Sequence, residues 1–360
     1  MLRSWKKDAI VSTDCGAVAN LKGPPVNTGS GADGEMRAAA MALMAGTDVE
    51  SGATLFGQLS KAIGKGLATE AALDAAVRRT FKMMFTVGRF DPANASEWNT
   101  FGLESINSTA SQEANFEAGL QGQVLLRNDG VLPIKPGSKV AVVGPQSASR
   151  MGMLSSYASY QFCHGNQTIQ TPQSYCITTI EEGIRAANVG GVTTAADGVD
   201  INSNATAGIA AALELARGAD VVVLALGIDK SIEKEGTDRD DTALPGLQEP
   251  FAKQVLALDK PTVLLLTNGG ALAIDNLTSR ARNETAPYAI VEAFNPNVLG
   301  ARAVGAALFG AANRWGKLPI TIYPHSFIAE QQMSNYDMAK PPGRTYKYYT
   351  GEPLFPFGVK

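Results

Sequence analysis

From about residue 140 onward, continuous apolar runs alternate with amphipathic segments. The apolar runs are rich in β-branched residues and predict buried strands at 140–144, 192–196, 221–228, 262–270 and 288–295. Between them, apolar residues recur with helical spacing at 178–188, 206–219, 244–258 and 299–311. Strands that alternate with helices predict an α/β fold with a mostly parallel, doubly wound sheet.

The first ninety residues have a different pattern. A short β-branched run, AIVST, precedes Asp14, and a loop rich in Gly and Pro follows it. Helical periodicity then predicts helices at 35–46, 55–66 and 68–90, the last opening at Thr69. From Asp91 to about Ser111 the chain is rich in Pro, Asn, Ser and Thr and has no periodicity, which is typical of an interdomain linker.

Size and charge narrow the function classes. A chain of 360 residues is long enough for two domains, and 45% hydrophobic with 18% charged residues is typical of a soluble globular protein. The net charge of -3 gives no basic face for nucleic acid, and no apolar run approaches the ~20 residues that span a membrane. Small neutral ligands remain open.

Six Asn-x-Ser/Thr sequons favour a secretory route and hence a secreted glycoprotein; they begin at Asn94, Asn107, Asn166, Asn204, Asn276 and Asn283. The N-terminus has no charged segment followed by an apolar one, so we expect either that a signal peptide was removed or that the true start is missing.

The usual metal, redox and cofactor motifs are missing from the sequence. Its three cysteines match no zinc spacing and no Cys-x-x-Cys pair; Cys163 and Cys176 could close a polar loop as a disulfide, or remain free buried thiols. The glycine segments TNGGALA and VVGPQSASRMG fit no nucleotide-binding pattern and are better explained as turns. Two histidines, His164 and His325, leave little scope for a Ser-His-Asp triad, and His325 is expected at the surface. We expect no cofactor and no metal.

Carboxylates are the better candidates for chemistry. The strand predicted at 221–228 runs into a loop that contains Asp229, Glu233, Glu235, Asp238, Arg239, Asp240 and Asp241. Ligands of open α/β sheets bind beyond the carboxyl ends of the strands, and Asp14 has the same placement after AIVST. From charge alone, a solvated acidic loop is the better explanation of the residues after 228, and an aspartate that ends a strand is also a common turn former.

Three motifs carry a specific resemblance. STDCGAVANL with AGTDVESG resembles the nucleophile region of glycoside hydrolase family 3, β-xylosidase-like branch, and GIDKSIEKEGTDRDDTALPG resembles the acid/base loop of that branch. The ending GRTYKYYTGEPLFPFG resembles the close of its second catalytic domain. GRF at residues 88–90, LLRNDGVLPI and GKLPITIYP follow in the family's order, so the resemblance covers nearly the whole chain.

The resemblance implies a fold and a pair of catalytic residues. Residues 1–91 would be the C-terminal remnant of a (β/α)8 barrel, 92–110 a linker, and 111–360 an α/β sandwich domain. Asp14 would be the nucleophile and Glu233 the acid/base, with Glu235 as the alternative. A retaining glycosidase needs two carboxyl groups about 5–5.5 Å apart, one to attack the sugar and one to protonate the leaving group.

The surroundings of the predicted acid/base can be read from the same loop. Glu235, Asp238 and Asp240 would favour a proton on Glu233, whereas Arg239 would oppose it.

The chain also departs from the family pattern. About 14 residues precede the end of the nucleophile strand, so we expect most barrel strands to be missing, along with the fibronectin-like domain that often follows in this branch. Ser51 stands where related sequences often have Cys, which would leave Cys15 without that partner.

We therefore predict an exo-acting retaining β-xylosidase acting on xylo-oligosaccharides, inactive as this truncated chain. β-Glucosidase or α-L-arabinofuranosidase activity, a non-catalytic carbohydrate-binding or interaction module, and a truncated gene product without independent function are the alternatives. The expected partner is the oligosaccharide substrate, without nucleic acid or membrane.

Overall fold

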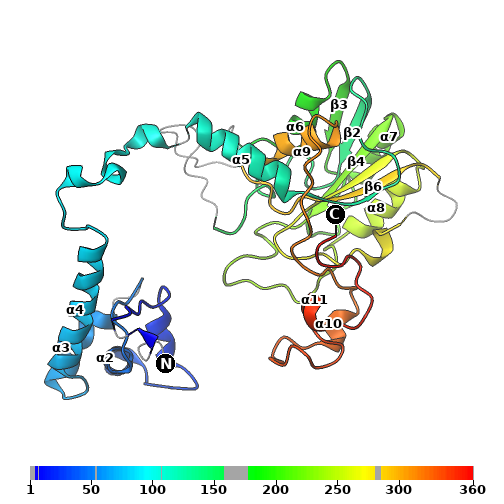
Figure 1. Ribbon diagram of the computed structural model, residues 1–360. Coiled ribbons are helices and arrows are strands. Elements are labelled where there is room, and N and C mark those ends of the chain that lie inside the picture. Colours follow the sequence, from blue (N-terminus) through cyan, green and yellow to red (C-terminus); the bar gives the residue numbers. More distant parts are fainter. Residues whose placement is uncertain are drawn as a thin grey trace. The chain divides into compact units, whose positions relative to one another are not determined.

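The computed structural model describes residues 5–6, 8–52, 55–106, 108–157, 177–279 and 285–359. The chain divides into two compact units, Met1–Leu103 and Glu104–Lys360 (Figure 1). The boundary falls within the segment 92–110 that the sequence predicts as a linker. Each unit is described separately below.

The C-terminal unit is built on a six-stranded sheet with the order β1-β6-β5-β4-β2-β3. Five neighbouring strands are parallel, and β1 pairs antiparallel with β6 at one edge. The fold prediction of a mostly parallel α/β sheet is confirmed. The strands are β1 (Val124–Asn128), β2 (Lys139–Val143), β3 (Val192–Ala196), β4 (Val221–Gly227), β5 (Thr262–Thr267) and β6 (Tyr288–Glu292).

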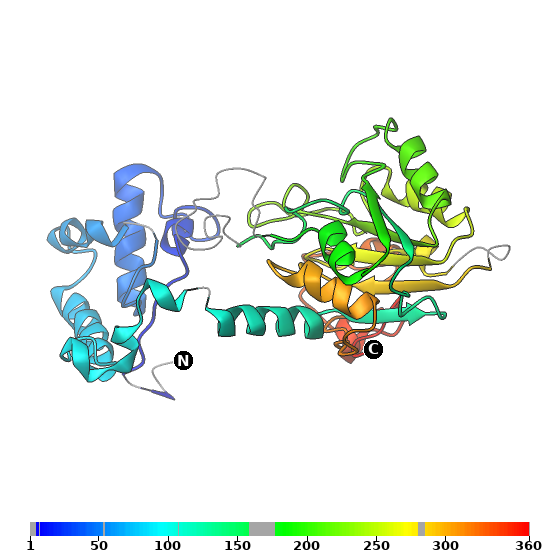
Figure 2. The same ribbon diagram turned by 90° about the horizontal axis from the view of Figure 1, so that it is seen from above.

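Helices cover both faces of this sheet (Figures 1 and 2). On one face α6 (Ile180–Ala187) and α9 (Gly300–Leu308) pack together, and α5 (Thr109–Gly122) packs on α9. The other face carries α7 (Ile209–Arg217) and α8 (Gln248–Leu256). Alternate residues of β4 enter the two cores, Val223 beneath α6 and α9 and Leu224 beneath α7 and α8. Burial on both faces explains why the predicted strands are continuously apolar.

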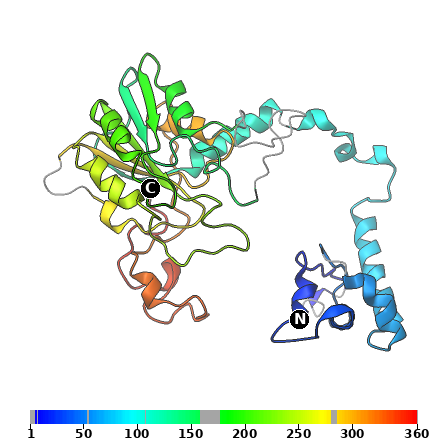
Figure 3. The same ribbon diagram turned by 180° about the vertical axis from the view of Figure 1, so that it is seen from behind.

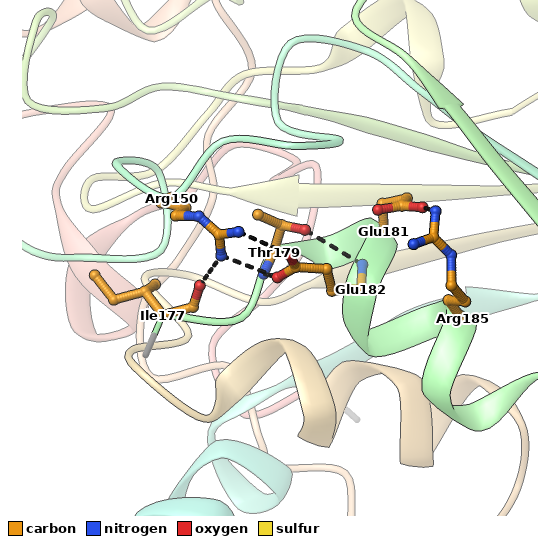
Figure 4. A network of polar contacts seen from close by, with 6 residues as sticks. All are labelled: Arg150, Ile177, Thr179, Glu181, Glu182 and Arg185. Atoms are coloured by element: carbon orange, nitrogen blue, oxygen red, sulfur yellow. Dashed lines mark hydrogen bonds and ion pairs between the residues drawn. The ribbon is translucent and has the colours of Figure 1, made fainter. Parts of the chain in front are cut away.

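The start of α6 is fixed by polar contacts (Figure 4). Thr179 and Glu182 form a capping box, in which the Thr179 hydroxyl accepts the Glu182 N–H and the Glu182 carboxylate accepts the Thr179 N–H. Arg150, from the segment after β2, makes a bidentate ion pair with Glu182 at 2.7 and 2.9 Å and also donates to the Ile177 carbonyl. The Arg150 guanidinium lowers the pKa of the Glu182 carboxyl. This contact therefore ties the segment after β2 to the helix that follows it.

The N-terminal unit is helical in the described residues. α2 (Gly31–Ala45) packs against the 3₁₀ helices η1 (Ala17–Lys22) and η2 (Leu55–Gln58), and against α3 (Leu59–Gly64) and α4 (Glu70–Thr86). The predicted opening of the last helix at Thr69 is confirmed, because its hydroxyl accepts the Ala72 N–H at 3.2 Å.

The predicted AIVST strand is wrong as a regular strand. Its residues make one isolated parallel bridge, Ser12 to Val49, and no continuous ladder. A strand needs a neighbouring strand to satisfy its backbone groups, and the described part of this unit offers one bridge partner.

Several elements were not predicted. β1 lies at the sheet edge and ends in polar residues, which hides its strand pattern. α5 has few apolar side chains and packs through small ones: a Cβ on Gly119 would lie 3.1 Å from the Ala303 Cβ. Short 3₁₀ helices occupy the predicted linker, η3 (Ala93–Ala95), η4 (Glu97–Thr100) and η5 (Leu103–Ser105), and η6 (Asp275–Leu277) follows β5.

Two further short helices near the C-terminus, α10 (Phe327–Glu330) and α11 (Thr345–Tyr348), were also missed (Figure 3). Each is a single turn, too short to give a periodic pattern. They are held together by aromatic contacts, with Phe327 stacked on Tyr323 and edge-on to Tyr349.

Two remaining sequence predictions concern membranes and the disulfide. Within the residues that the structure describes, we find no helix with the length and apolar character needed to cross a membrane. Cys163, Cys176 and His164 lie outside the described residues, so the predicted disulfide stays a prediction.

Candidate active site

The predicted acid/base loop follows β4 directly. Gly227 ends the strand with a positive φ of 146°, where an added Cβ would lie 1.8 Å from the Thr267 carbonyl oxygen. The Asp229 carboxylate then accepts the Ser231 N–H at 2.8 Å, and the Glu233 N–H donates to the Asp229 carbonyl at 3.2 Å. This local turn places Glu233 beyond the carboxyl end of the sheet.

The Glu233 carboxylate is held on two sides. Its Oε1 accepts the Gly270 N–H at 2.5 Å, and its Oε2 pairs with the Arg239 Nε at 2.7 Å. Gly270 belongs to the turn after β5, which lies next to β4 in the sheet. A Cβ on Gly269 would lie 2.7 Å from Glu233 Oε1, so the turn approaches the carboxylate as closely as glycine allows. The turn after β5, at the carboxyl end of the sheet, thus binds Glu233 through a backbone N–H.

Arg239 supplies the opposite charge. Its side chain is 13% exposed, and its Nη2 donates to the Ala271 carbonyl at 2.8 Å. The Nη1 atom is buried without a hydrogen-bond partner. The sequence predicts that Arg239 lies close to Glu233, and in the structure the two side chains form a direct ion pair.

The other carboxylates of the loop lie at its surface. Glu235, Asp238 and Asp240 are exposed, and the Glu235 N–H donates to the Ser156 hydroxyl at 3.0 Å. The structure therefore brings Arg239 to Glu233, whereas the three carboxylates remain in solvent.

Asp241 and His325 meet at the surface, with 2.8 Å between Asp241 Oδ1 and His325 Nε2. The pKa of Asp241 is lowered, mainly because its carboxylate accepts the Ala243 N–H, with a smaller contribution from His325. The His325 side chain is 46% exposed, consistent with the expected surface position.

Asp14 belongs to the N-terminal unit. It comes two residues after Ser12, whose bridge to Val49 is reinforced by a 3.0 Å hydrogen bond from the Thr13 N–H to the Val49 carbonyl. The Asp14 side chain is exposed, and its Oδ1 accepts the Cys15 N–H at 2.7 Å. The carboxylate is thus anchored at one oxygen and open to solvent.

Cys15 lies beside this carboxylate as an exposed free thiol. Its Sγ is 3.1 Å from the Ser51 hydroxyl oxygen. Ser51, which stands where related sequences often have Cys, is therefore in contact with Cys15.

Sequence reasoning missed three residues beneath the site, two with polar side chains and one that binds through its backbone. Asn268, Gly270 and Glu292 all lie at the carboxyl ends of β5 and β6. Glu292 is completely buried, which raises its pKa to about 8. A charged residue inside the apolar run YAIVEAFN was the signal that could have identified it. The described residues contain no group of three His, Cys, Asp or Glu side chains able to hold a metal ion.

Comparison with protein families decides the relationship. Residues 123–360 match the glycosyl hydrolase family 3 C-terminal domain. The chain belongs to glycosyl hydrolase family 3. The α/β unit described above is the part that carries the match.

Family 3 proteins also match beyond this domain. The probable exo-1,4-beta-xylosidase bxlB of Aspergillus oryzae is 33% identical over 351 residues, which cover 97% of this chain and 41% of that protein. Beta-D-xylosidase 1 of Arabidopsis thaliana is 32% identical over 361 residues, covering 98% of this chain and 44% of that protein. The chain therefore spans about two fifths of the length of these curated relatives.

Solved structures agree. A family 3 exo-beta-xylosidase, XlnD, in complex with a xylobiose aziridine probe has a TM-score of 0.83 at 27% identity, covering 99% of this chain and 44% of that one. The beta-glucosidase EmGH1 from Erythrobacter marinus has a TM-score of 0.76 at 29% identity, covering 99% of this chain and 49% of that one.

Proposed function

We propose that this chain carries both catalytic carboxyl groups of a retaining, exo-acting β-xylosidase, with Asp14 as nucleophile and Glu233 as acid/base. The similarity that supports the substrate class is the 33% identity to a protein named exo-1,4-beta-xylosidase across nearly the whole chain. The observation that carries the choice of Glu233 is its position beyond the end of β4, held between Gly270 and Arg239.

The two carboxyl groups suit the two roles differently. Asp14 is exposed, and the Cys15 N–H holds one of its oxygens, which leaves the other oxygen open for attack on a sugar carbon. Glu233 is ion-paired with Arg239, which suits the second step, in which the carboxylate accepts a proton from water. To act as an acid in the first step, Glu233 would have to bind a proton and weaken its pairing with Arg239.

Covalent trapping tests the nucleophile. A 2-deoxy-2-fluoro xyloside should leave a stable glycosyl group on Asp14, because a retaining mechanism passes through a glycosyl-enzyme intermediate. The tryptic peptide Asp8–Lys22 contains two side-chain carboxyls, Asp8 and Asp14, so mass spectrometry of this peptide is informative. Asp14→Asn should abolish the label and Asp8→Asn should retain it; a label elsewhere would remove Asp14 from the role.

The test uses both the 360-residue chain and a chimera that adds the remaining part of the Aspergillus oryzae relative. We expect the chain alone to turn over slowly, because barrel enzymes hold their substrate with loops that follow many strands. In the described part of the N-terminal unit the sole β-pairing is the Ser12–Val49 bridge. Rapid hydrolysis by the chain alone would contradict this expectation.

The acid/base assignment has its own variants. Glu233→Ala should lose most activity on poor leaving groups, keep more on activated aryl xylosides and regain rate with azide. Glu235→Ala is the matched control, and the same pattern there would transfer the role to Glu235. Parallel assays with aryl glucosides and arabinofuranosides distinguish the alternative activities. Binding of xylo-oligosaccharides without turnover in the chimera would instead favour a non-catalytic module.

We also propose that the protein is secreted and glycosylated. Asn94, Asn204 and Asn276 open sequons and are exposed, whereas the other three sequon asparagines lie outside the described residues. Treatment of the protein from a eukaryotic secretion host with an endoglycosidase should lower its mass. An unchanged mass would contradict the proposal.

A further inference from the structure

A buried carboxyl lies beneath the predicted acid/base. Glu292, the last residue of β6, is 0% exposed, and its neighbours across the sheet are Val124 of β1 and Leu266 of β5. Its Oε1 accepts the Phe294 N–H at 3.0 Å, and its Oε2 has no hydrogen-bond partner. A carboxylate in such surroundings is costly, so the site favours the protonated acid.

No opposite charge compensates Glu292 within the strands that flank it. β5 contains no charged residue. The charged residue of β1 is Arg127, which pairs with Asp129. The pKa of Glu292 is raised by burial, and the hydrogen bond from the Phe294 N–H moderates this rise.

Asn268 connects this carboxyl to the site. It follows β5 and is fully buried, and its N–H donates to the Phe294 carbonyl at 3.1 Å. Phe294 is thereby joined to both residues, because its own N–H donates to Glu292 Oε1. The side-chain nitrogen of Asn268 donates to the Gly270 carbonyl at 3.1 Å. The Gly270 N–H in turn binds Glu233 at 2.5 Å. Hydrogen bonds through Phe294, Asn268 and Gly270 therefore link the two glutamates.

We propose that Glu292 is a positioning residue that acts on Glu233 through Phe294, Asn268 and Gly270. The neutral acid accepts a weaker bond from the Phe294 N–H, and in that state Asn268 holds the Gly270 turn in place. An ionised Glu292 binds the Phe294 N–H more strongly, which shifts the Phe294 carbonyl, the Asn268 that donates to it and the Gly270 N–H that binds Glu233. The catalytic importance of this coupling rests on the proposed role of Glu233, whereas the coupling itself does not.

The charged groups on the far side of the turn are Glu233 and Arg239, which pair with each other. Against this background, a pH titration of the Gly270 amide signal should report the ionisation of Glu292. The Glu292 event is expected at about pH 8, where its carboxyl ionises.

The Gly270 amide can be observed selectively. The sequence contains two Gly-Gly pairs, Gly190–Gly191 and Gly269–Gly270. Glycine labelled with both ¹³C at the carbonyl and ¹⁵N therefore gives carbonyl-to-amide NMR signals for Gly191 and Gly270 alone. The Gly191 N–H donates to the Asn188 carbonyl and serves as an internal control.

The experiment titrates the full 360-residue chain from about pH 5 to about pH 9. In the unsubstituted protein the Gly270 signal should shift near pH 8 while the Gly191 signal does not. Glu292→Gln, which keeps the shape and removes the ionisation, should lose that shift and still fold. Asn268→Ala should displace the Gly270 signal at every pH, and the exposed Glu214→Gln should leave the titration unchanged.

Two outcomes would overturn the proposal: a shift near pH 8 that survives in Glu292→Gln, or an unchanged Gly270 signal in Asn268→Ala. These NMR measurements need no catalysis, so a failure of the proposed coupling can be distinguished from a failure of the proposed function. In an active chimera, Asn268→Ala should lower kcat by up to about a hundredfold with little change in KM, because a misplaced acid/base slows the chemical step.

Discussion

Replacing Glu292 with glutamine should flatten the pH dependence of the stability of the C-terminal unit. The carboxyl has a pKa of about 8 in the folded protein, against an ordinary value of 4.5. Between these values the unfolded chain has released the proton that the folded protein still binds. The contribution of Glu292 to stability is therefore fully present below about pH 4.5 and is lost as the pH rises toward 8.

The magnitude follows from the two pKa values. Each pH unit within this window costs about 1.4 kcal/mol, reduced near its ends where both states titrate. The free energy of unfolding should fall by about 2.5 kcal/mol between about pH 5 and about pH 7 because of this one carboxyl. Glu292→Gln has no proton to release, so this fall should disappear from its profile.

Urea unfolding at a series of pH values measures the difference. Trp315 is the one tryptophan of residues 104–360, so a Trp5→Phe, Trp98→Phe background makes fluorescence report the C-terminal unit. Glu214→Gln is the matched control, because the Glu214 side chain is 78% exposed and should keep the slope of the parent protein. If the free energy of unfolding falls equally with pH in Glu292→Gln and in its parent, Glu292 does not hold a proton at neutral pH in the folded protein.

Three further changes test other parts of the structure. Ser51→Cys should form a disulfide with Cys15, detectable by non-reducing peptide mapping, and should raise the stability of the N-terminal unit by up to about 4 kcal/mol; a free thiol at both positions after oxidation would contradict the 3.1 Å contact. Gly183→Ala should cost about 1–3 kcal/mol in urea unfolding, because its Cβ would lie 2.0 Å from a carbonyl oxygen of α9, whereas Gly122→Ala, with nothing within 4 Å, should be neutral. Glu182→Gln should be less stable than its parent at neutral pH, and the difference should vanish in acid as the parent carboxylate, whose pKa is lowered, takes up its proton.

The sequence by itself determined most of the parallel sheet. β2, β4, β5 and β6 are apolar on both faces, and such a run has few alternatives to a strand covered by helices. Thr69 likewise marked its helix start, because its hydroxyl bonds to a backbone group three residues away. Features that depend on neighbours within a few residues can be read from a sequence.

Tertiary structure decided what happens around the candidate acid/base. Gly270 binds Glu233 from 37 residues away, and no local pattern specifies that partner. Of the charged residues in the loop, Arg239 reaches Glu233 because the chain folds it under the Gly270 turn. The residues alone name the carboxylates, the family resemblance selects Glu233 among them, and only the folded chain supplies its partners Gly270 and Arg239.

Two further features, the AIVST segment and Glu292, also depend on contacts between distant segments. The AIVST run has the composition of a strand, yet Ser12 forms a single bridge to Val49, because a strand is defined by the pairing of its neighbours. Glu292 has an ordinary side chain whose proton is held by complete burial between two strands. Composition and period fix which segments are apolar, whereas pairing and the protonation of buried groups arise from contacts between distant segments, which only the folded chain creates.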